Sequence, residues 1–297
     1  MERASNGVRV VVIQNGASRS RRAPDEVAAV LRAAGVDVEV RVVEGAACRE
    51  AAVAAALGAD AVVAAGGDGT VSAVAGALAG TGTPVGVLPL GTLNHFARDL
   101  GIPLDLVEAA RVVAAGAVRL VDVAEVNGHL FVNNSSVGFY PRVVRRRKRL
   151  RAFVGKWLAM AWGALEVLWR LPRIPLRLET EGGAAPVVTP FLFVGNNRYE
   201  PGLLAERRRE ALDRGELRVY VARWAGRRAF VGVALRWLLG RGRDEDVAEL
   251  SARTVRVESR RRGLDVAADG EVLRLRPPLR YVIRPRALSV LAPRPAP

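Results

Sequence analysis

Three glycines, an aspartate and a threonine stand together in the run Gly66-Gly67-Asp68-Gly69-Thr70. Glycine lets a backbone approach a phosphate group closely, because it carries no side chain. The first turn of a following helix offers unpaired N–H groups and a positive dipole end to an anion. Asp68 could hold Mg²⁺ beside a triphosphate, and Thr70 could add a hydroxyl donor. The run predicts a phosphate-binding loop, although glycines also serve strand-to-helix turns for geometry alone.

A second glycine loop follows at residues 88–103, which read LPLGTLNHFARDLGIP. Its Gly91-Thr92 pair repeats the order of strand, glycine, threonine and helix seen in the first loop. Two neighbouring strand ends would then face one crevice at the carboxyl edge of a sheet, where a nucleotide fits. The chain has neither a Walker A run nor a G-x-G-x-x-G run, so neither P-loop nor Rossmann binding is supported.

The rhythm of residues 8–116 predicts the elements that must position these loops. Short apolar runs alternate with helix-like runs, as in a mostly parallel sheet that is covered by crossover helices. The expected strands are residues 8–14, 36–43, 60–65 and 84–88, and the expected helices are residues 25–34, 48–57 and 71–78. The first half of the chain is therefore expected to be an α/β domain.

After residue 116 the pattern changes to alternating, hairpin-like segments, with Asn127-Gly128 as a tight-turn signal. The expected strands are residues 120–126, 129–134, 176–181, 187–194, 216–222, 254–259 and 272–275, and residues 227–239 look helical. We predict an α/β nucleotide-binding domain with a mostly parallel sheet over residues 1–119, a β-rich, sandwich-like second domain over residues 120–290, and a frayed Pro-rich tail over residues 291–297.

The composition narrows the class of protein. The chain has 297 residues, one cysteine, Cys48, and a formal net charge of +15. A single cysteine excludes an internal disulfide framework, and no Cys/His cluster offers a zinc site, so we expect a cytoplasmic protein. The short polar start lacks the order of a secretory signal. The positive net charge favours binding to nucleic acid or to an anionic membrane, although scattered arginines are also typical of an ordinary solvated surface.

A basic run adjoins an aromatic segment in the middle of the chain. Residues 145–151 read RRRKRLR, and Trp157, Trp162 and Trp169 follow. Arginines can meet anionic headgroups while tryptophans sit at the interface, which predicts a helix lying on the inner membrane surface. The equal alternative is a helix that packs its aromatic side chains on the β-domain. Nucleic acid is the least expected partner, because the aromatic residues are not interleaved through a basic β-face.

Together, the two loops resemble those of the diacylglycerol kinase catalytic family, which includes bacterial lipid kinases and the sphingosine and ceramide kinases. The resemblance extends over nearly the whole chain. Further matches in the family's order and spacing are residues 121–123 (VDV), 131–134 (FVNN), 137–139 (VGF), 195–197 (GNN) and 269–271 (DGE). The pair of glycine loops is a specific signal, whereas GGDGT alone is shared with other kinases.

The resemblance implies a kinase that uses ATP and Mg²⁺ to phosphorylate a lipid hydroxyl. The implied ATP contacts are Asn15, Gly66, Gly67, Asp68, Gly69, Thr70, Gly91, Thr92 and Asn94. Asp68, with Asp122 as a second contributor, is implied for the metal, and Glu271 is implied as the general base that accepts the hydroxyl proton. By spacing alone, Asp269-Gly270-Glu271 is more often a surface turn between two strands.

This chain departs from the family pattern at three places. Gly16 stands where the family often has a proline after Asn15, and His95 stands where it often has an aspartate near the phosphates. His95 would instead be a neutral hydrogen-bonding residue at a helix start. Arg214, in the run Ala211-Leu212-Asp213-Arg214-Gly215, replaces a carboxylate of the structural magnesium site that bacterial members build, which argues against that metal here.

Two rival functions stay open. A NAD kinase or phosphofructokinase-type enzyme shares the GGDG turn and would phosphorylate a soluble hydroxyl, but the second glycine loop argues against it. A catalytically weak lipid-binding protein could keep the pocket, yet Asp68 and Glu271 are both present. Diacylglycerol, sphingoid bases, ceramide and phosphatidylglycerol all remain candidate acceptors, because motifs do not encode the shape of a lipid cavity. The oligomeric state is open, a homodimer included.

Overall fold

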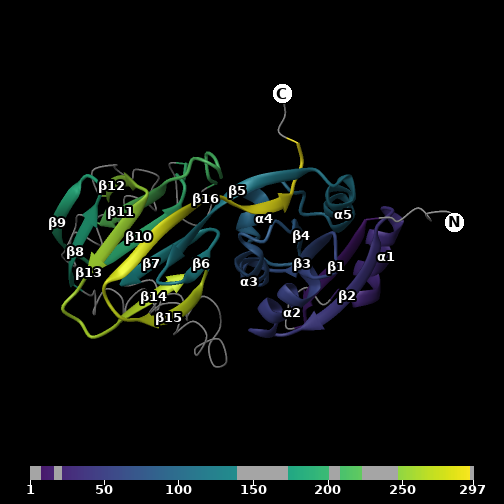
Figure 1. The fold of residues 1–297 in the computed structure, drawn as a ribbon, viewed down its shortest axis with the longest axis horizontal. Coiled ribbons are helices and arrows are strands. Elements are labelled where there is room, and N and C mark those ends of the chain that lie inside the picture. Colours follow the sequence, from purple (N-terminus) through teal and green to yellow (C-terminus); the bar gives the residue numbers. More distant parts are fainter. Residues whose placement is uncertain (1–7, 17–21, 139–172, 201–207, 223–246, 295–297) are drawn as a thin grey trace, which may run out of the picture. The chain divides into compact units, whose positions relative to one another are not determined.

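The structure of the protein, a computed structural model, describes residues 8–16, 22–138, 173–200, 208–222 and 247–294. The chain divides into two compact units, which are residues 1–123, 211–214 and 284–297, and residues 124–210 and 215–283. Two strands, β5 (Val118–Val126) and β16 (Leu279–Leu291), run from one unit into the other (Figure 1). The C-terminal return into the first unit differs from the predicted division at residues 119 and 290.

The first unit is an α/β domain around a parallel sheet. In chain order it contains β1 (Arg9–Asn15), α1 (Pro24–Ala33), β2 (Asp37–Val43), α2 (Ala47–Ala56), β3 (Ala61–Gly66), α3 (Asp68–Leu78), β4 (Val85–Pro89), α4 (His95–Asp99) and α5 (Leu106–Ala115). The strand order is β2-β1-β3-β4, and the end of β16 joins β4 in parallel. All four predicted strands lie within one residue of the observed ones, which confirms the predicted fold class of this half.

Helices cover both faces of this sheet. Successive side chains of a strand point to opposite faces, and the last two residues of β1 show which helix lies on each. Gln14 donates to the carbonyl of Arg22, just before α1, whereas Asn15 donates to Thr70 in α3. Helix α1 packs with α5, and α2 packs with α3. The β3 strand is buried along its whole length, as expected for a central strand that is covered twice.

The second unit is β-rich, as predicted. Its further strands are β6 (His129–Phe131), β7 (Asn134–Gly138), β8 (Ile174–Thr180), β9 (Gly183–Thr189), β10 (Phe191–Asn196), β11 (Leu217–Ala222), β12 (Val247–Ala252), β13 (Thr254–Glu258), β14 (Leu264–Ala268) and β15 (Glu271–Leu275). One antiparallel sheet has the order β12-β11-β10-β7-β14-β15, and β16-β13-β8-β9 are the antiparallel part of the sheet that β16 continues from β4. Side chains of both sheets share one core, which includes Leu192, Val266, Val257 and Tyr281. This is a sandwich-like arrangement.

Several predicted elements of this half differ from the observed ones. The expected strand at residues 187–194 is two strands, β9 and β10, with Pro190 between them, since proline cannot donate to a ladder. The strands β12, β14 and β16 were not predicted. Leu291 ends β16 and is buried, so it is not part of a frayed tail. The expected helix at residues 227–239 lies outside the described residues.

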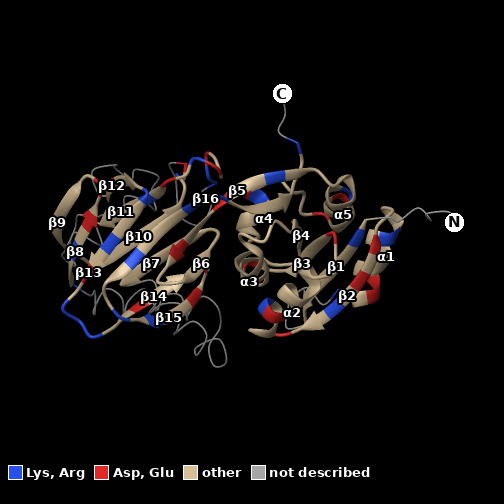
Figure 2. Cartoon of the chain, in the orientation of Figure 1, with Lys and Arg blue, Asp and Glu red and all other residues tan. Residues whose placement is uncertain are grey.

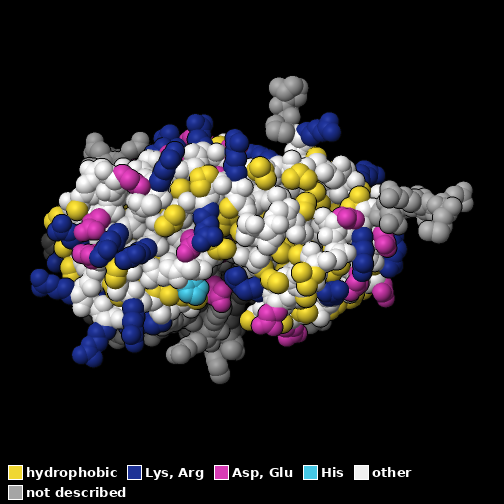
Figure 3. Space-filling view, in the orientation of Figure 1, with side chains coloured by type: hydrophobic (Ala, Val, Ile, Leu, Met, Phe, Trp, Pro, Cys, Tyr) yellow, Lys and Arg dark blue, Asp and Glu magenta, His cyan; other side chains and the backbone are white. Residues whose placement is uncertain are grey.

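Charge does not single out one surface of the described chain. Basic side chains occur on both units (Figure 2), and on the face drawn in Figure 3 they are interspersed with acidic and apolar ones. Among the described helices, none combines the length and the apolar character needed to cross a bilayer. The basic and aromatic segment from residue 145 to residue 169 lies outside the described residues, so the membrane-surface helix stays a prediction.

Candidate nucleotide-binding site

The two glycine loops lie side by side at the carboxyl ends of β3 and β4. These strands are parallel neighbours, with Gly66 opposite Pro89. The N–H of Leu90 donates to the carbonyl of Gly66 at 3.0 Å, which joins one loop to the other. A Cβ built on Gly91 would lie 2.5 Å from the Cα of Gly67. The two strand ends therefore meet at one edge of the sheet, as the spacing of the loops predicts.

Two of the glycines have no room for a side chain. A Cβ on Gly66 would lie 2.5 Å from the hydroxyl oxygen of Thr70, and a Cβ on Gly91 would also lie 2.6 Å from Oδ1 of Asn94. Neither glycine has a positive φ, so close approach rather than backbone conformation requires glycine here. The sequence reasoning assigned these glycines to phosphate binding, and the structure adds that the loops could not pack without them.

Asp68 begins α3 directly after the extended residue Gly67. The carbonyl of Gly67 accepts the N–H groups of Thr70 and Val71, which starts the helical ladder. The Oδ1 atom of Asp68 is buried and has no hydrogen-bonding partner among the residues that the structure describes. Such an atom costs about 1–3 kcal/mol relative to a satisfied one, and in folded proteins it often marks a functional position. A ligand donor or a cation at this helix start would satisfy it.

Asn15 reaches the same loop from the end of β1. Its Nδ2 donates to the hydroxyl oxygen of Thr70 at 3.1 Å, and the Thr70 side chain is buried. The contact joins residues that are 55 positions apart in the chain. Asn15, predicted as an ATP contact, is thus placed beside the predicted phosphate loop. This hydrogen bond holds the start of α3 against the central strands.

Asn94 braces the second loop from within. Its φ of 50° lies in the left-handed region, which asparagine tolerates better than most residues. Its Oδ1 accepts the Gly91 N–H at 2.9 Å, and its Nδ2 donates to the carbonyls of Pro89 and Gly91. The amide therefore shapes the loop, and a direct contact with ATP stays a prediction. Thr92 is exposed beside it, and His95 begins α4, at the helix start where we expected it.

Asp122 is a buried carboxylate on β5, also in the first unit. Its Oδ1 accepts the N–H of Arg286 at 2.8 Å, and its own N–H donates to the carbonyl of Leu212. These bonds join β5, β16 and the short segment 211–214. Among the residues that the structure describes, no group of three or more His, Cys, Asp or Glu side chains could hold a metal ion. The metal role of Asp122 stays a prediction.

Glu271 belongs to the second unit, where it is the exposed first residue of β15. It follows a two-residue turn, Asp269-Gly270, in which both residues have positive φ. The Asp269 carboxylate accepts three backbone N–H groups from residues 132–134. Sequence reasoning treated this run as a turn or a base and missed the clamp. It also missed the buried Arg209, which nothing in the run of arginines at residues 207–209 distinguishes from its neighbours.

Comparison with known proteins connects this site to a family. Residues 9–126 match the model of the diacylglycerol kinase catalytic domain. A "Probable lipid kinase YegS-like" of Klebsiella pneumoniae (strain 342) is 37% identical over 151 residues, which cover 49% of this chain and 51% of that protein. A "Probable lipid kinase YegS" of Escherichia fergusonii is 38% identical over 153 residues with the same coverage. The chain thus spans about half the length of the curated relatives it matches.

Solved structures show the same fold over almost the whole chain. A diacylglycerol kinase of Bacillus anthracis str. Sterne has a TM-score of 0.70 and 19% identity, covering 98% of both chains. Another structure from that organism has a TM-score of 0.74 and 21% identity, covering 98% of this chain and 99% of that one. The resemblance predicted from the glycine loops is confirmed for residues 9–126, and the two-part fold is confirmed for the chain.

Proposed function

We propose that this chain, whose residues 9–126 match the model of the diacylglycerol kinase catalytic domain, transfers the γ-phosphate of ATP to a lipid hydroxyl. One observation carries the proposal. The backbones of Gly67 and Gly91 are in contact at the start of α3, where Oδ1 of Asp68 is buried without a partner. Bare backbone and a helix N-terminus suit a phosphate chain, and the orphaned oxygen suits a cation that accompanies it.

Mg²⁺ fits this donor set only together with the nucleotide. Magnesium is usually held by one or two carboxylates plus substrate phosphates and water, rather than by a cage of protein ligands. Asp68 supplies such a carboxylate, and Asp122 is proposed as a further contributor to the acidic surroundings. A bound Mg²⁺ would supply neutralisation of the charge that develops on the transferred phosphoryl group.

The chain's own residues have separate tasks in the proposed reaction. Residues 66–70 bind the phosphates through backbone N–H groups, while Asn15 and Asn94 keep the two loops in place. Glu271 is proposed as the general base that accepts the proton of the lipid hydroxyl as its oxygen attacks phosphorus. An unassisted hydroxyl is a poor nucleophile, so a carboxylate within hydrogen-bond reach would raise the rate.

The acceptor is proposed to be a lipid with a free hydroxyl, such as a diacylglycerol or a sphingoid base. The relatives are named as probable lipid kinases, and a kinase that acts on a membrane lipid must reach the membrane. The basic segment at residues 145–151 is proposed to provide that contact, from the cytoplasmic side and without spanning the bilayer.

The test is a labelling assay with the purified full-length protein. It is incubated with labelled ATP, Mg²⁺ and mixed vesicles that contain diacylglycerol, sphingosine, ceramide or phosphatidylglycerol, and NAD is offered in a parallel reaction. Label on one lipid, absent with Asp68→Ala, supports the proposal. Label on NAD instead would favour the soluble-hydroxyl enzyme. ATP binding without any labelled product would favour the lipid-binding protein that lacks turnover.

A further inference from the structure

The orientation of Glu271 depends on the turn that precedes it. Asp269 and Gly270 have φ values of 45° and 82°, and Ala268 pairs with Glu271 across the hairpin of β14 and β15. Glu271 is therefore the first residue after a two-residue turn that needs two left-handed residues. Glycine adopts that conformation readily, and aspartate adopts it more easily than most residues but at some cost, which hydrogen bonds from its surroundings can offset.

The surroundings fix Asp269 through its carboxylate. Oδ2 accepts the N–H of Val132 at 2.7 Å, and Oδ1 accepts the N–H groups of Asn133 and Asn134 at 2.9 and 3.1 Å. The N–H of Asp269 donates in return to the carbonyl of Asn134 at 2.9 Å. The turn is thus bound to residues 132–134, the link between β6 and β7, which we call the 132–134 link. Any shift of that link is passed to the turn.

Arg209 holds the 132–134 link through different atoms. Its side chain is only 6% exposed. Nη1 donates to the carbonyl of Val132 and, at 3.3 Å, to that of Asn196, while Nη2 donates to Oδ1 of Asn133 at 3.2 Å. Asn196 adds a bond from Nδ2 to the carbonyl of Val132 at 2.9 Å. A planar guanidinium holds its donors in a rigid fork that matches several fixed acceptors at once, whereas the ammonium group of a lysine lacks that geometry.

The two charges reinforce each other through the link. Val132 and Asn133 give their N–H groups to the anionic Asp269, and they give a backbone and a side-chain oxygen to the cationic Arg209. Hydrogen bonds in such a chain polarise one another, so each charge strengthens the bonds made to the other. Loss of the cation would therefore weaken the grip on the turn as well as the bonds that it makes itself.

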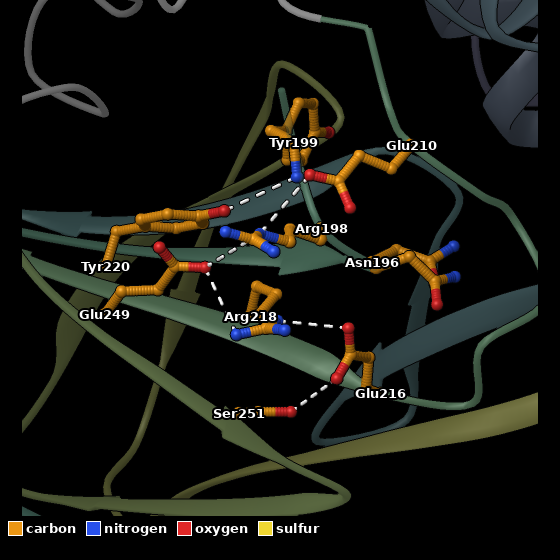
Figure 4. A network of polar contacts seen from close by, with 10 residues as sticks. Asn196, Arg198, Tyr199, Glu210, Glu216, Arg218, Tyr220, Glu249 and Ser251 are labelled. Carbon is orange, nitrogen blue, oxygen red and sulfur yellow. Dashed lines mark hydrogen bonds and ion pairs between the residues drawn. The ribbon is translucent and has the colours of Figure 1, made fainter. Parts of the chain in front are cut away.

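A network of polar contacts keeps Arg209 in place. Residues 198–200 and 208–210 run antiparallel, with Tyr199 opposite Arg209 in an isolated bridge. The N–H of Glu210 donates to the carbonyl of Arg198 at 3.1 Å, and the two side chains form an ion pair at 3.4 Å. Figure 4 shows Arg198 between Glu210 and Glu249, the second of which also pairs with Arg218. The buried guanidinium thus comes from a segment, residues 208–210, that is held to residues 198–200 by backbone hydrogen bonds and an ion pair.

We infer that Arg209 is a positioning residue for Glu271, acting through the 132–134 link and the Asp269-Gly270 turn. The inference rests on the proposed role of Glu271 as the base. Arg209 does not touch the reacting atoms. It sets where the Glu271 carboxylate stands, and a small misplacement of a catalytic group lowers turnover without changing the affinity for ATP.

The test compares two neighbouring arginines in the full-length protein. Arg209→Met keeps the length of the side chain and removes its donors, and Arg208→Met makes the same change at an exposed position. The vesicles contain the lipid that accepts phosphate from labelled ATP in the assay described above. With them, Arg209→Met is expected to lower kcat about 10-fold or more and to leave KM for ATP unchanged. Arg208→Met is expected to match the wild type. A wild-type kcat in Arg209→Met overturns the inference.

A double-mutant cycle separates positioning from a merely structural effect. If Arg209 acts through the Glu271 carboxylate, Arg209→Met should cost little further turnover in a Glu271→Gln background. An equal loss in both backgrounds overturns the inference. If Arg209→Met does not fold, the same cycle is measured with Arg209→Lys. It keeps the charge without the fork, and a smaller fall in kcat that again vanishes in the Glu271→Gln background is expected.

Hydrogen exchange of the wild type and Arg209→Met gives a readout that needs no activity. Faster exchange in peptides that cover residues 132–134 and 268–272, with the peptides of β1 and β3 unchanged, is expected. If exchange in the peptide that covers residues 268–272 is the same in Arg209→Met as in the wild type, the inference is overturned, even if kcat has fallen. If the wild type phosphorylates no lipid but the exchange pattern is as expected, the proposed function is wrong and the coupling of Arg209 to the turn still holds.

Discussion

The backbone of Gly91 lies against that of Gly67, so closely that a Cβ on Gly91 would stand 2.5 Å from the Cα of Gly67. Real Cβ atoms do not approach a backbone carbon so closely, and the backbone cannot swing aside as a long side chain can. The two loops can adopt this arrangement only while position 91 is glycine, and a Cβ on Gly67 would also be tight, at 3.3 Å from the Cα of Gly91. The proposed binding of a phosphate chain at this edge of the sheet would thereby depend on two positions that are 24 residues apart in the chain.

Gly91→Ala should therefore weaken ATP binding. The added methyl group must push the loops apart, and overpacking of this kind costs about 1–3 kcal/mol. If the cost falls on the nucleotide-binding conformation, the Kd for ATP measured by calorimetry should rise about 10-fold or more. The matched control is Gly58→Ala, where a Cβ would meet nothing within 4 Å. If a folded Gly91→Ala protein binds ATP with unchanged affinity, the contact between Gly67 and Gly91 is not needed for ATP binding.

Asp68→Ala should abolish turnover and leave the fold intact. The buried Oδ1 has no protein partner to lose, and the interaction of an acidic residue with a helix N-terminus contributes only about 0.3–1 kcal/mol. Lipid phosphorylation and thermal unfolding are measured together. Asp25→Ala, which removes an exposed acidic residue from the first turn of α1, is the control and should keep full turnover. Undiminished turnover in Asp68→Ala would refute the role of Asp68.

The first unit could be predicted from the sequence because its signals are local. Buried apolar runs such as residues 61–65 end at glycines, and helical periodicity follows at once, so each strand and each loop is set within a few residues. The contact of Gly67 with Gly91 follows from strand order, because β3 and β4 are neighbours. The candidate phosphate loop was thus found from spacing alone.

The second unit was harder to predict because its signals are distant. β16 alternates Arg280, Arg284 and Arg286 with apolar residues and pairs with β13 and then with β4, a return that no local pattern shows. The Asp269 clamp joins residues about 136 positions apart. Arg209 is buried because of partners at residues 132–133 and 196, whereas the run of arginines around it suggests only a solvated surface.

Glu271→Gln should lower turnover and leave ATP binding unchanged. Glutamine has the same shape but cannot accept a proton at neutral pH, so loss of a general base typically costs about 10²–10⁴-fold in rate. Single-turnover phosphorylation and ATP calorimetry separate the two effects. The control Glu258→Gln changes a half-buried glutamate of the same unit, which forms an ion pair with Arg256. Normal turnover in Glu271→Gln would remove Glu271 as the base.

Neutralising Arg145, Arg146 and Arg147 should weaken binding to anionic vesicles. Each basic side chain near a negatively charged membrane contributes about 1 kcal/mol, and the effect should fade at high salt. Flotation with phosphatidylglycerol-containing and purely zwitterionic vesicles measures it. The control neutralises Arg9, Arg41 and Arg111, which form ion pairs with glutamates; Arg9 and Arg111 are exposed, and Arg41 is half-buried. Equal loss in both triple variants would show that net charge, rather than this segment, governs binding.

Asn94 should matter through its conformation and through its hydrogen bonds, and two substitutions separate these contributions. Asn94→Gly keeps the left-handed conformation and loses the bonds to Gly91 and Pro89, whereas Asn94→Ala loses both. Each variant should weaken ATP binding, because the second loop is no longer braced. Asn94→Ala should unfold about 1 kcal/mol more easily than Asn94→Gly, the cost of placing a Cβ in the left-handed region. Denaturant unfolding of both variants measures the difference. Equal stability of the two would mean that the loop gives up this conformation once the amide is gone.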